Sequence, residues 1–359
     1  MNILYLAPIA YEDLRQRPQY IAERLAEKHT VVYVEPTVRA VSCVLGRANG
    51  YKGQVRIISK NLTIVRCNGT FVAPFRWKPY DILNIGSMAE KIQLKKYVDT
   101  AELILVGYEG WTDIIWKCKN TKIIYDKMDD NVLLTPEISL KRYLQKAETK
   151  LLRKITCMVV TAQKFAKVYQ DRVKHIYLIP NGIDIDIKSK NEKKKSDEKN
   201  KVFGYIGMIS EWFDMEALKV IAEQKNISVD MVGPCNIEKY DKQNVFYEGC
   251  IPKDEVGNKI QEFDVCLYPF KKGELLDTIN PVKIYEYLAE NKPVIAVDSL
   301  ETRRFGTLVY RYHNYKELKQ LCNMELKKPF ETETECMNYI EKNSWEERTK
   351  QFEKILEAL

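Results

Sequence analysis

Residues 277–296 read DTINPVKIYEYLAENKPVIA and place a cation where a helix disfavours one. Asn280 fits the N-cap position and Pro281 the first position of a helix, which makes Lys283 its third residue. The first turn carries the positive end of the helix dipole, so a lysine there is unfavourable unless a negative group lies beside it. The free backbone amides at this end also favour an anion. The segment therefore predicts an anion-binding site at the start of the helix.

Glu286 indicates what the anion belongs to, because it lies three residues after Lys283 on the same helical face. A carboxylate there accepts two hydrogen bonds from the hydroxyls of a ribose, while the lysine and the helix amides hold phosphates. Together these groups fit a nucleotide diphosphate. The alternative is a surface ion pair between the two side chains, worth about 0.2–0.5 kcal/mol, with Ile284, Leu288 and Ala289 as the core-facing stripe.

The elements that must position these residues alternate along the whole chain of 359 residues. Apolar runs such as ILYLA, TVVYVE and LILVGY alternate with amphipathic runs such as RPQYIAERLAEK, and the alternation restarts at VFGYIGM. This pattern predicts the α/β class, with two doubly wound halves whose parallel sheets are covered on both faces. Ligands of such sheets bind beyond the carboxyl ends of the strands, so functional residues are expected in the loops that follow strands.

Several nucleotide-binding and catalytic motifs are absent from the sequence. No Gly-x-Gly-x-x-Gly follows the first apolar run, and there is no Walker A or Gly-x-Ser-x-Gly motif. A nicotinamide or flavin site, a P-loop nucleotidase and an acyl hydrolase are therefore not expected. Nine widely spaced cysteines without a Cys-x-x-Cys pair, three scattered histidines and no membrane-length apolar run indicate a cytoplasmic protein with reduced thiols and no metal site.

Part of the net charge of +7 is local, because residues 188–201 hold seven lysines against three acidic residues. Such a run is typical of a solvated loop. The alternative is a phosphate-rich partner, either an anionic membrane surface or a nucleic acid. The run has no aromatic residues on which bases could stack, so no nucleic-acid partner is expected.

The segment TINPVKIYEYLAENKPVIA resembles the donor-binding segment of bacterial glycosyltransferases with the GT-B fold. It is most similar to a family-four-like subset in capsule and teichuronic-acid-type polysaccharide synthesis, which carries an Asn-Pro-x-Lys-x-Tyr-Glu-Tyr-Leu-Ala core. Many retaining members have two glutamates separated by seven residues, and Thr278 stands here in place of the first. The positions that match the core are Asn280, Pro281, Lys283, Tyr285 and Glu286.

Other matches to this subset are distributed over nearly the whole chain: RQRPQYIAERLAE, YDKMDD at 125–130, IPNGID at 179–184 and GYIGMISEWFD at 204–214. The resemblance implies two Rossmann-like domains that face a cleft. Residues 1–183 would form an acceptor-side domain and residues 184–343 a nucleotide-sugar-binding domain. Residues 344–359, with Ser344 as the helix cap and Trp345 at the helix start, would cross back to the first domain.

The resemblance also assigns donor-binding roles. Gly207, at the end of the first strand of the second domain, would let the backbone approach the diphosphate. Common family members place an arginine and a lysine shortly after this glycine, whereas this chain has SEWFD from Ser210 onward. Lys283 and the helix amides would then carry more of the phosphate charge. Arg17 is a candidate second cation, and a surface arginine at a helix start is the alternative.

Asp126, Asp129 and Asp130 follow the predicted strand KIIYD. They fit turn formers and helix caps, but a carboxylate facing the cleft can also accept the proton of an acceptor hydroxyl. Such general-base help is typically worth 10²–10⁴-fold. Asp129 or Asp130 would be the base if the enzyme inverts, whereas in a retaining enzyme the leaving phosphate oxygen accepts the proton and these residues only orient the acceptor.

The resemblance implies a metal-independent transferase that needs no cofactor and uses a nucleotide diphosphate sugar, UDP-linked in preference to GDP-linked. The acceptor would be a polysaccharide or lipid-linked saccharide. The segment FVAPFRWKPY at 71–80 fits either a packed loop or an aromatic and basic rim at an anionic membrane, which would place the protein at the inner face of that membrane. Two alternatives remain open: a nucleotide-sugar epimerase of this fold, or a non-catalytic scaffold, which Thr278 and the missing clamp would favour.

Overall fold

The computed structural model describes residues 1–13, 15–38, 53–69, 85–115, 118, 121–184 and 200–359. These residues form two compact units: unit 1 is Met1–Pro180 with Thr349–Leu359, and unit 2 is Asn181–Arg348. The aromatic segment 71–80 and most of the lysine-rich run lie outside the described residues. Among the residues that are described, no helix is both long and apolar enough to cross a membrane.

Unit 1 is built on an eight-stranded sheet with the order β3-β4-β2-β1-β5-β6-β7-β8. Every neighbouring pair is parallel except β3 and β4. The central strands are buried along their whole length, as expected for a sheet covered on both faces. The strands are β1 (Asn2–Leu6), β2 (Thr30–Val34), β3 (Gln54–Ser59), β4 (Leu62–Arg66), β5 (Leu103–Val106), β6 (Lys122–Lys127), β7 (Cys157–Val160) and β8 (Ile176–Leu178).

The helices of unit 1 follow the predicted alternation with strands. They are α1 (Arg17–Leu25), α3 (Ile85–Thr100), α4 (Thr112–Ile115), α5 (Asn131–Leu134), α6 (Ile138–Leu151) and α7 (Gln163–Tyr169), with a short 3₁₀ turn, η2 (Glu109–Trp111), after β5. The last helix, α13 (Trp345–Ala358), begins in unit 2. Its expected cap is confirmed, because the Ser344 hydroxyl accepts a hydrogen bond from the amide of Glu347 at 3.1 Å.

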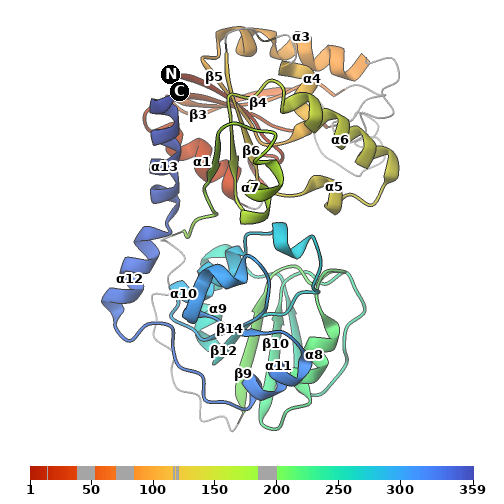
Figure 1. The fold of residues 1–359 in the computed structure, drawn as a ribbon, viewed down its shortest axis with the longest axis vertical. Coiled ribbons are helices and arrows are strands. Elements are labelled where there is room, and N and C mark those ends of the chain that lie inside the picture. The colour runs from red at the N-terminus through yellow and green to blue at the C-terminus, as the bar shows by residue number, and fades with distance from the viewer. Residues whose placement is uncertain (14, 39–52, 70–84, 116–117, 119–120, 185–199) are drawn as a thin grey trace. The chain divides into compact units, whose positions relative to one another are not determined.

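Unit 2 has a six-stranded parallel sheet in the order β11-β10-β9-β12-β13-β14. This is the doubly wound order of nucleotide-binding sheets, in which the strand order reverses between the first and fourth strands. Helices α9 and α10 lie on one side of the sheet and α8 and α11 on the other (Figure 1). The elements are β9 (Lys201–Ile206), α8 (Met215–Ala222), β10 (Ile227–Val232), β11 (Val245–Gly249), α9 (Val256–Glu262), β12 (Val265–Tyr268), α10 (Val282–Ala289), β13 (Val294–Val297), β14 (Tyr310–Tyr312), α11 (Tyr315–Cys322) and α12 (Glu333–Lys342).

The predicted α/β class with two doubly wound parallel sheets is confirmed. The sequence pattern missed the antiparallel edge strand β3, whose residues are mostly exposed and show no buried face. It also missed β4 and the strands β8 and β14, of which the last two are each three residues long. Strands this short are defined by their pairing with β7 and β13 rather than by a pattern of their own.

Candidate functional site

The donor-type helix α10 begins one residue later than predicted. Pro281, with φ −80° and ψ 86°, is the N-cap, so Lys283 is the second helical residue and not the third. The prediction that Asn280 caps the helix is wrong, because its side chain bonds to other parts of unit 2 and no side chain caps α10. The cation nevertheless lies in the first turn, where the helix dipole is positive.

Lys283 and Glu286 form the ion pair that was the alternative to ligand binding, with 2.8 Å between Nζ and Oε2. The pair is not a free surface pair, because Glu286 is only 7% exposed. Lys283 keeps about a third of its side chain exposed, at 31%. Glu286 is therefore held by the helix packing, while the Lys283 side chain keeps part of its surface exposed.

Two other residues of the donor-type segment have their side chains engaged inside unit 2. The Thr278 hydroxyl is buried and donates to the carbonyl of Leu275 at 2.7 Å. The ring of Tyr285 packs edge-on against Phe305, with 4.9 Å between the ring centroids. The hydroxyl of Thr278 is therefore used inside unit 2, and the ring of Tyr285 is part of its packing.

Gly207 directly follows β9 and comes very close to Gly233, which follows β10. Both have positive φ values, +153° and +129°, which L side chains rarely adopt. A Cβ atom on Gly233 would lie 2.1 Å from the carbonyl oxygen of Gly207. The two loops therefore converge as bare backbone. Ser210, three residues after Gly207, is buried, and its hydroxyl has no hydrogen-bond partner within the described structure.

The strand order places Gly207 and the start of α10 at the same edge of the sheet, where the strand order reverses. The order of the sheet reverses between β9 and β12, and Gly207 follows β9 while the loop after β12 leads to α10. Crevices outside the carboxyl ends of strands at such a reversal are where open α/β sheets bind ligands. Unit 2 thus brings together the two parts of the chain that were predicted to hold a diphosphate.

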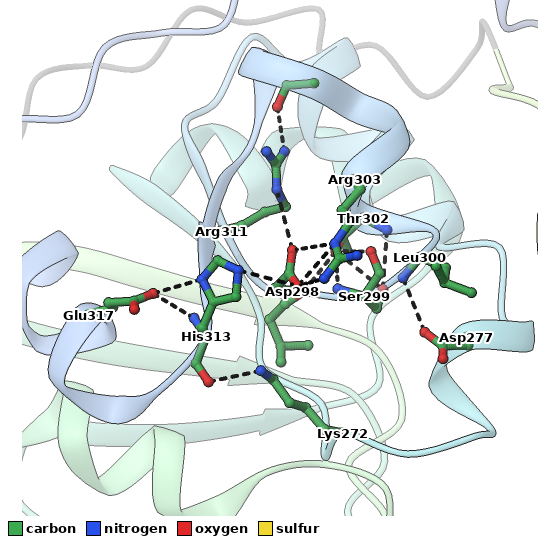
Figure 2. Close-up of polar contacts among 12 residues, drawn as sticks. Lys272, Asp277, Asp298, Ser299, Leu300, Thr302, Arg303, Arg311, His313 and Glu317 are labelled. Atoms are coloured by element: carbon green, nitrogen blue, oxygen red, sulfur yellow. Dashed lines mark hydrogen bonds and ion pairs between the residues drawn. The ribbon is translucent and has the colours of Figure 1, made fainter.

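A second feature of this edge was not predicted from the sequence. The loops after β12 and β13 form an open pocket of about 310 Å³, lined by Lys272, Gly273, Leu276, Asp277, Asp298, Ser299, Leu300 and Arg303. Figure 2 shows Asp298 at the centre of its polar contacts. The rule that loops after strands carry function, applied to the residues following PVIAV, would have pointed to this place.

Asp298 is contacted by several basic side chains at the carboxyl ends of β13 and β14 (Figure 2). Arg303 donates from Nε at 3.0 Å, while Arg311 Nε and His313 Nε2 lie 3.7 and 3.5 Å from the carboxylate. The hydrogen bonds from Arg303 hold the pKa of Asp298 below its ordinary value. Lys272 joins the cluster by donating to the carbonyl of His313 at 2.8 Å. The cluster ties the loop after β12 to the loop after β14.

Arg17 in unit 1 has an internal role. Its guanidinium binds both carboxylate oxygens of Asp126, at 2.8–3.1 Å, and donates to the carbonyls of Ile179 and Pro180 at 3.0 and 3.1 Å. Arg17 is 3% exposed and Asp126 is 0% exposed, so this arginine is not a surface residue. Because its donors are used in this way, Arg17 is not part of the proposed donor site.

The two candidate bases of unit 1 differ in their surroundings. Asp130 is the N-cap of α5, and its Oδ1 accepts from the amides of Val132 and Leu133 at 3.1 and 3.0 Å. Asp129 is exposed and makes no hydrogen bond or ion pair with the described residues. Asp130 therefore has the capping role that was one of the two predicted roles, and the carboxylate of Asp129 is the one left available.

A buried charge cluster lies behind these aspartates. Lys127 Nζ is 2.6 Å from Glu148 Oε1, and Asn131 Nδ2 donates to Glu109 Oε2 at 2.8 Å. Burial alone would lower the pKa of Lys127, but Glu109 and Glu148 raise it above its ordinary value. Glu109 is fully buried, and its Oε1 has no hydrogen-bond partner among the described residues. Two buried carboxyl groups thus face one ammonium group.

Glu109 should make stability depend on pH. Burial raises its folded-state pKa, so the folded chain binds more protons than the unfolded chain above the unfolded value of about 4.3. Its contribution to stability is therefore lost as the pH rises from there through the folded pKa. We expect wild type to lose stability over this range, whereas Glu109→Gln should not. The difference in unfolding free energy, variant minus wild type, should therefore increase with pH, as measured by urea unfolding at a series of pH values. Glu27→Gln, at an exposed site, is the control, and an equal gain there would contradict the assignment.

The described residues contain no group of three His, Cys, Asp or Glu side chains arranged to hold a metal ion. None of the protein-family models matches the chain. A putative teichuronic acid biosynthesis glycosyltransferase of Bacillus subtilis, TuaH, is 21% identical over 227 residues, which cover 58% of this chain and 56% of that protein. The match thus spans little more than half of the relative's length.

Solved structures match over the whole chain. Sucrose-phosphate synthase of Thermosynechococcus elongatus has a TM-score of 0.71 at 14% identity and covers 100% of this chain and 99% of its own. Trehalose-6-phosphate synthase OtsA has a TM-score of 0.70 at 10% identity, with 99% of both chains covered. This chain has the GT-B fold. A third neighbour, Anabaena HepE in complex with UDP and glucose, has a TM-score of 0.64 at 15% identity and full coverage of both chains.

Proposed function

We propose that this GT-B protein is a glycosyltransferase that moves a sugar from a nucleotide diphosphate sugar to a hydroxyl of a polysaccharide or lipid-linked saccharide. The observation that carries the proposal is the position of Lys283 and Glu286 in the first turns of α10, next to the reversal of strand order in unit 2. The similarity to TuaH, a putative teichuronic acid biosynthesis glycosyltransferase, and to HepE, which was solved in complex with UDP and glucose, supports it. A UDP-sugar is the proposed donor.

In this proposal the diphosphate binds at the start of α10. The uncapped amides of the first turn and the ammonium of Lys283 would stabilise its negative charge, which grows as the sugar leaves. The Lys283–Glu286 ion pair would then break. Lys283 would bind a phosphate oxygen, and Glu286 would accept hydrogen bonds from the ribose hydroxyls. The bare backbone at Gly207 would allow close approach of the diphosphate, and the buried hydroxyl of Ser210 would lie behind it.

On the acceptor side we propose Asp129 as the group that receives or orients the acceptor hydroxyl. Asp129 is an exposed residue at the carboxyl edge of the unit 1 sheet, two residues after β6, and desolvation of its carboxyl raises the pKa above the ordinary value, which favours uptake of a proton. A cytoplasmic location and peripheral contact with an anionic membrane are part of the same proposal. A lipid-linked acceptor would require that contact.

The donor site is tested by calorimetry with UDP and a panel of UDP-, GDP-, TDP- and ADP-sugars. A hydrogen bond to a charged group contributes about 1.5–3 kcal/mol, so Lys283→Ala should weaken binding of the preferred nucleotide roughly 10- to 100-fold. Glu286→Ala should weaken UDP-sugar binding because the ribose loses its acceptor.

The matched control is Lys219→Ala, because Lys219 forms an i,i+3 ion pair with Glu216 at 2.7 Å on α8 of the same unit. This variant should bind like wild type. Equal losses in Lys283→Ala and Lys219→Ala would remove α10 from the donor site. Failure of wild type to bind any nucleotide sugar would overturn the proposed function.

A further inference from the structure

Asn280, directly before α10, connects two distant parts of unit 2. Its Oδ1 accepts from the amide of Asn181 at 2.9 Å, and its Nδ2 donates to Glu301 Oε2 at 3.1 Å. Asn181 returns a hydrogen bond from its own side chain to the Asn280 carbonyl at 3.3 Å. The side-chain amide of Asn280 is therefore used at both ends, and Asn280 is only 4% exposed.

Glu301 and Asn181 are themselves held in place. Glu301 is 1% exposed, and the oxygen that accepts from Asn280 also accepts from Arg304 NH1 at 2.8 Å. Asn181 is the first residue of unit 2, and its carbonyl accepts from Arg348, the last residue of the unit, at 3.1 Å. The network thus joins the start of α10 to the loop after β13 and to both chain ends of unit 2.

This network can fix the position of the N-terminus of α10 without a capping side chain. Side chains of Asp214, Asn314 and Thr332 cap α8, α11 and α12, whereas no side chain caps α10 or the shorter helix α9. A capping side chain would occupy the amides that an anion needs. The position of the helix start must then be fixed by residues that do not bond to its free amides. Buried hydrogen bonds to a carboxylate suit this role because they are directional and costly to break.

We propose that Asn280 and Glu301 are positioning residues that hold the N-terminus of α10 in the geometry that binds the diphosphate, without contacting it. The inference rests on the proposed function. It replaces the direct donor contact predicted for Asn280 by an indirect one. It also gives Glu301 a role that the sequence did not suggest.

The test exchanges donor and acceptor between the two side chains. Asn280→Asp places two carboxylates against each other in a buried site and should weaken UDP binding about tenfold or more, measured by calorimetry. Adding Glu301→Gln restores a donor opposite an acceptor, because the new amide can donate to the new carboxylate. The double variant should therefore return to within about threefold of wild type, a non-additive result expected for residues in direct contact.

Thermal unfolding of each variant separates positioning from general stability. Asn291 bridges the opposite end of α10 to Phe330 through bonds of 3.0 and 3.2 Å, so Asn291→Ala is a matched destabilised control. It should lower the midpoint of unfolding and leave UDP affinity unchanged. If Asn280→Asp does not fold, Asn280→Ala takes its place with the same expected direction.

Two results would overturn the inference alone. The first is that the single variants bind UDP like wild type. The second is that Asn291→Ala loses as much UDP affinity as Asn280→Asp for the same decrease in the unfolding midpoint. A wild type that binds neither UDP nor UDP-glucose would instead overturn the proposed function and the inference with it.

Discussion

Arg17→Met should destabilise unit 1 by about 3–5 kcal/mol, because it leaves the fully buried carboxylate of Asp126 without its cation. The loss includes the hydrogen bonds from the guanidinium to the carbonyls of Ile179 and Pro180. The guanidinium also lies 5.3 Å from the ring centroid of Phe352, a contact that methionine replaces only in part. Urea unfolding followed by circular dichroism measures the change.

Arg24→Met is the control, because Arg24 lies on the same helix and pairs with Glu27 at 3.0 Å on the exposed surface. It should change the unfolding free energy by less than about 1 kcal/mol. The double variant Arg17→Met, Asp126→Leu should recover much of the loss, since a buried ion pair can often be replaced by apolar side chains at little cost. Equal effects of Arg17→Met and Arg24→Met would contradict the structural role of Arg17.

Asp129→Asn should reduce sugar transfer by about 10²–10⁴-fold in kcat if Asp129 accepts the proton of the acceptor hydroxyl. Asparagine has nearly the same shape but cannot take up the proton. The measurement is release of UDP from a UDP-sugar in the presence of a mixture of polysaccharide and lipid-linked acceptors. UDP affinity should stay unchanged, because the proposed donor site lies in unit 2.

Asp130→Asn supplies the matched control, since asparagine caps a helix about as well as aspartate and so preserves the start of α5. It should transfer sugar at close to the wild-type rate. A loss below about tenfold in Asp129→Asn would mean that the proton goes elsewhere, for instance to the leaving phosphate oxygen of a retaining reaction, and would remove Asp129 as the base.

The sequence by itself determined the class of fold and the order of its elements. Continuous apolar runs such as those of β5 and β12 can be satisfied only in a sheet covered on both faces, and the amphipathic runs between them supply the cover. The same local information placed Lys283 in the first turn of a helix after a strand. These properties depend on neighbours within a few residues, which is why the pattern was sufficient.

Only the tertiary structure decided what the polar side chains do. Asn280 was predicted as a cap from its place before a proline, but its partners Asn181 and Glu301 are 99 and 21 residues away. Arg17 was predicted as a cation for the donor, yet its carboxylate partner comes 109 residues later. A buried polar group must be paired with whatever partner the fold brings to it. Residue spacing along the chain does not predict a partner that is distant in the sequence. The helix and its cation follow from local sequence, whereas the residues that hold them follow from the packing of the whole unit.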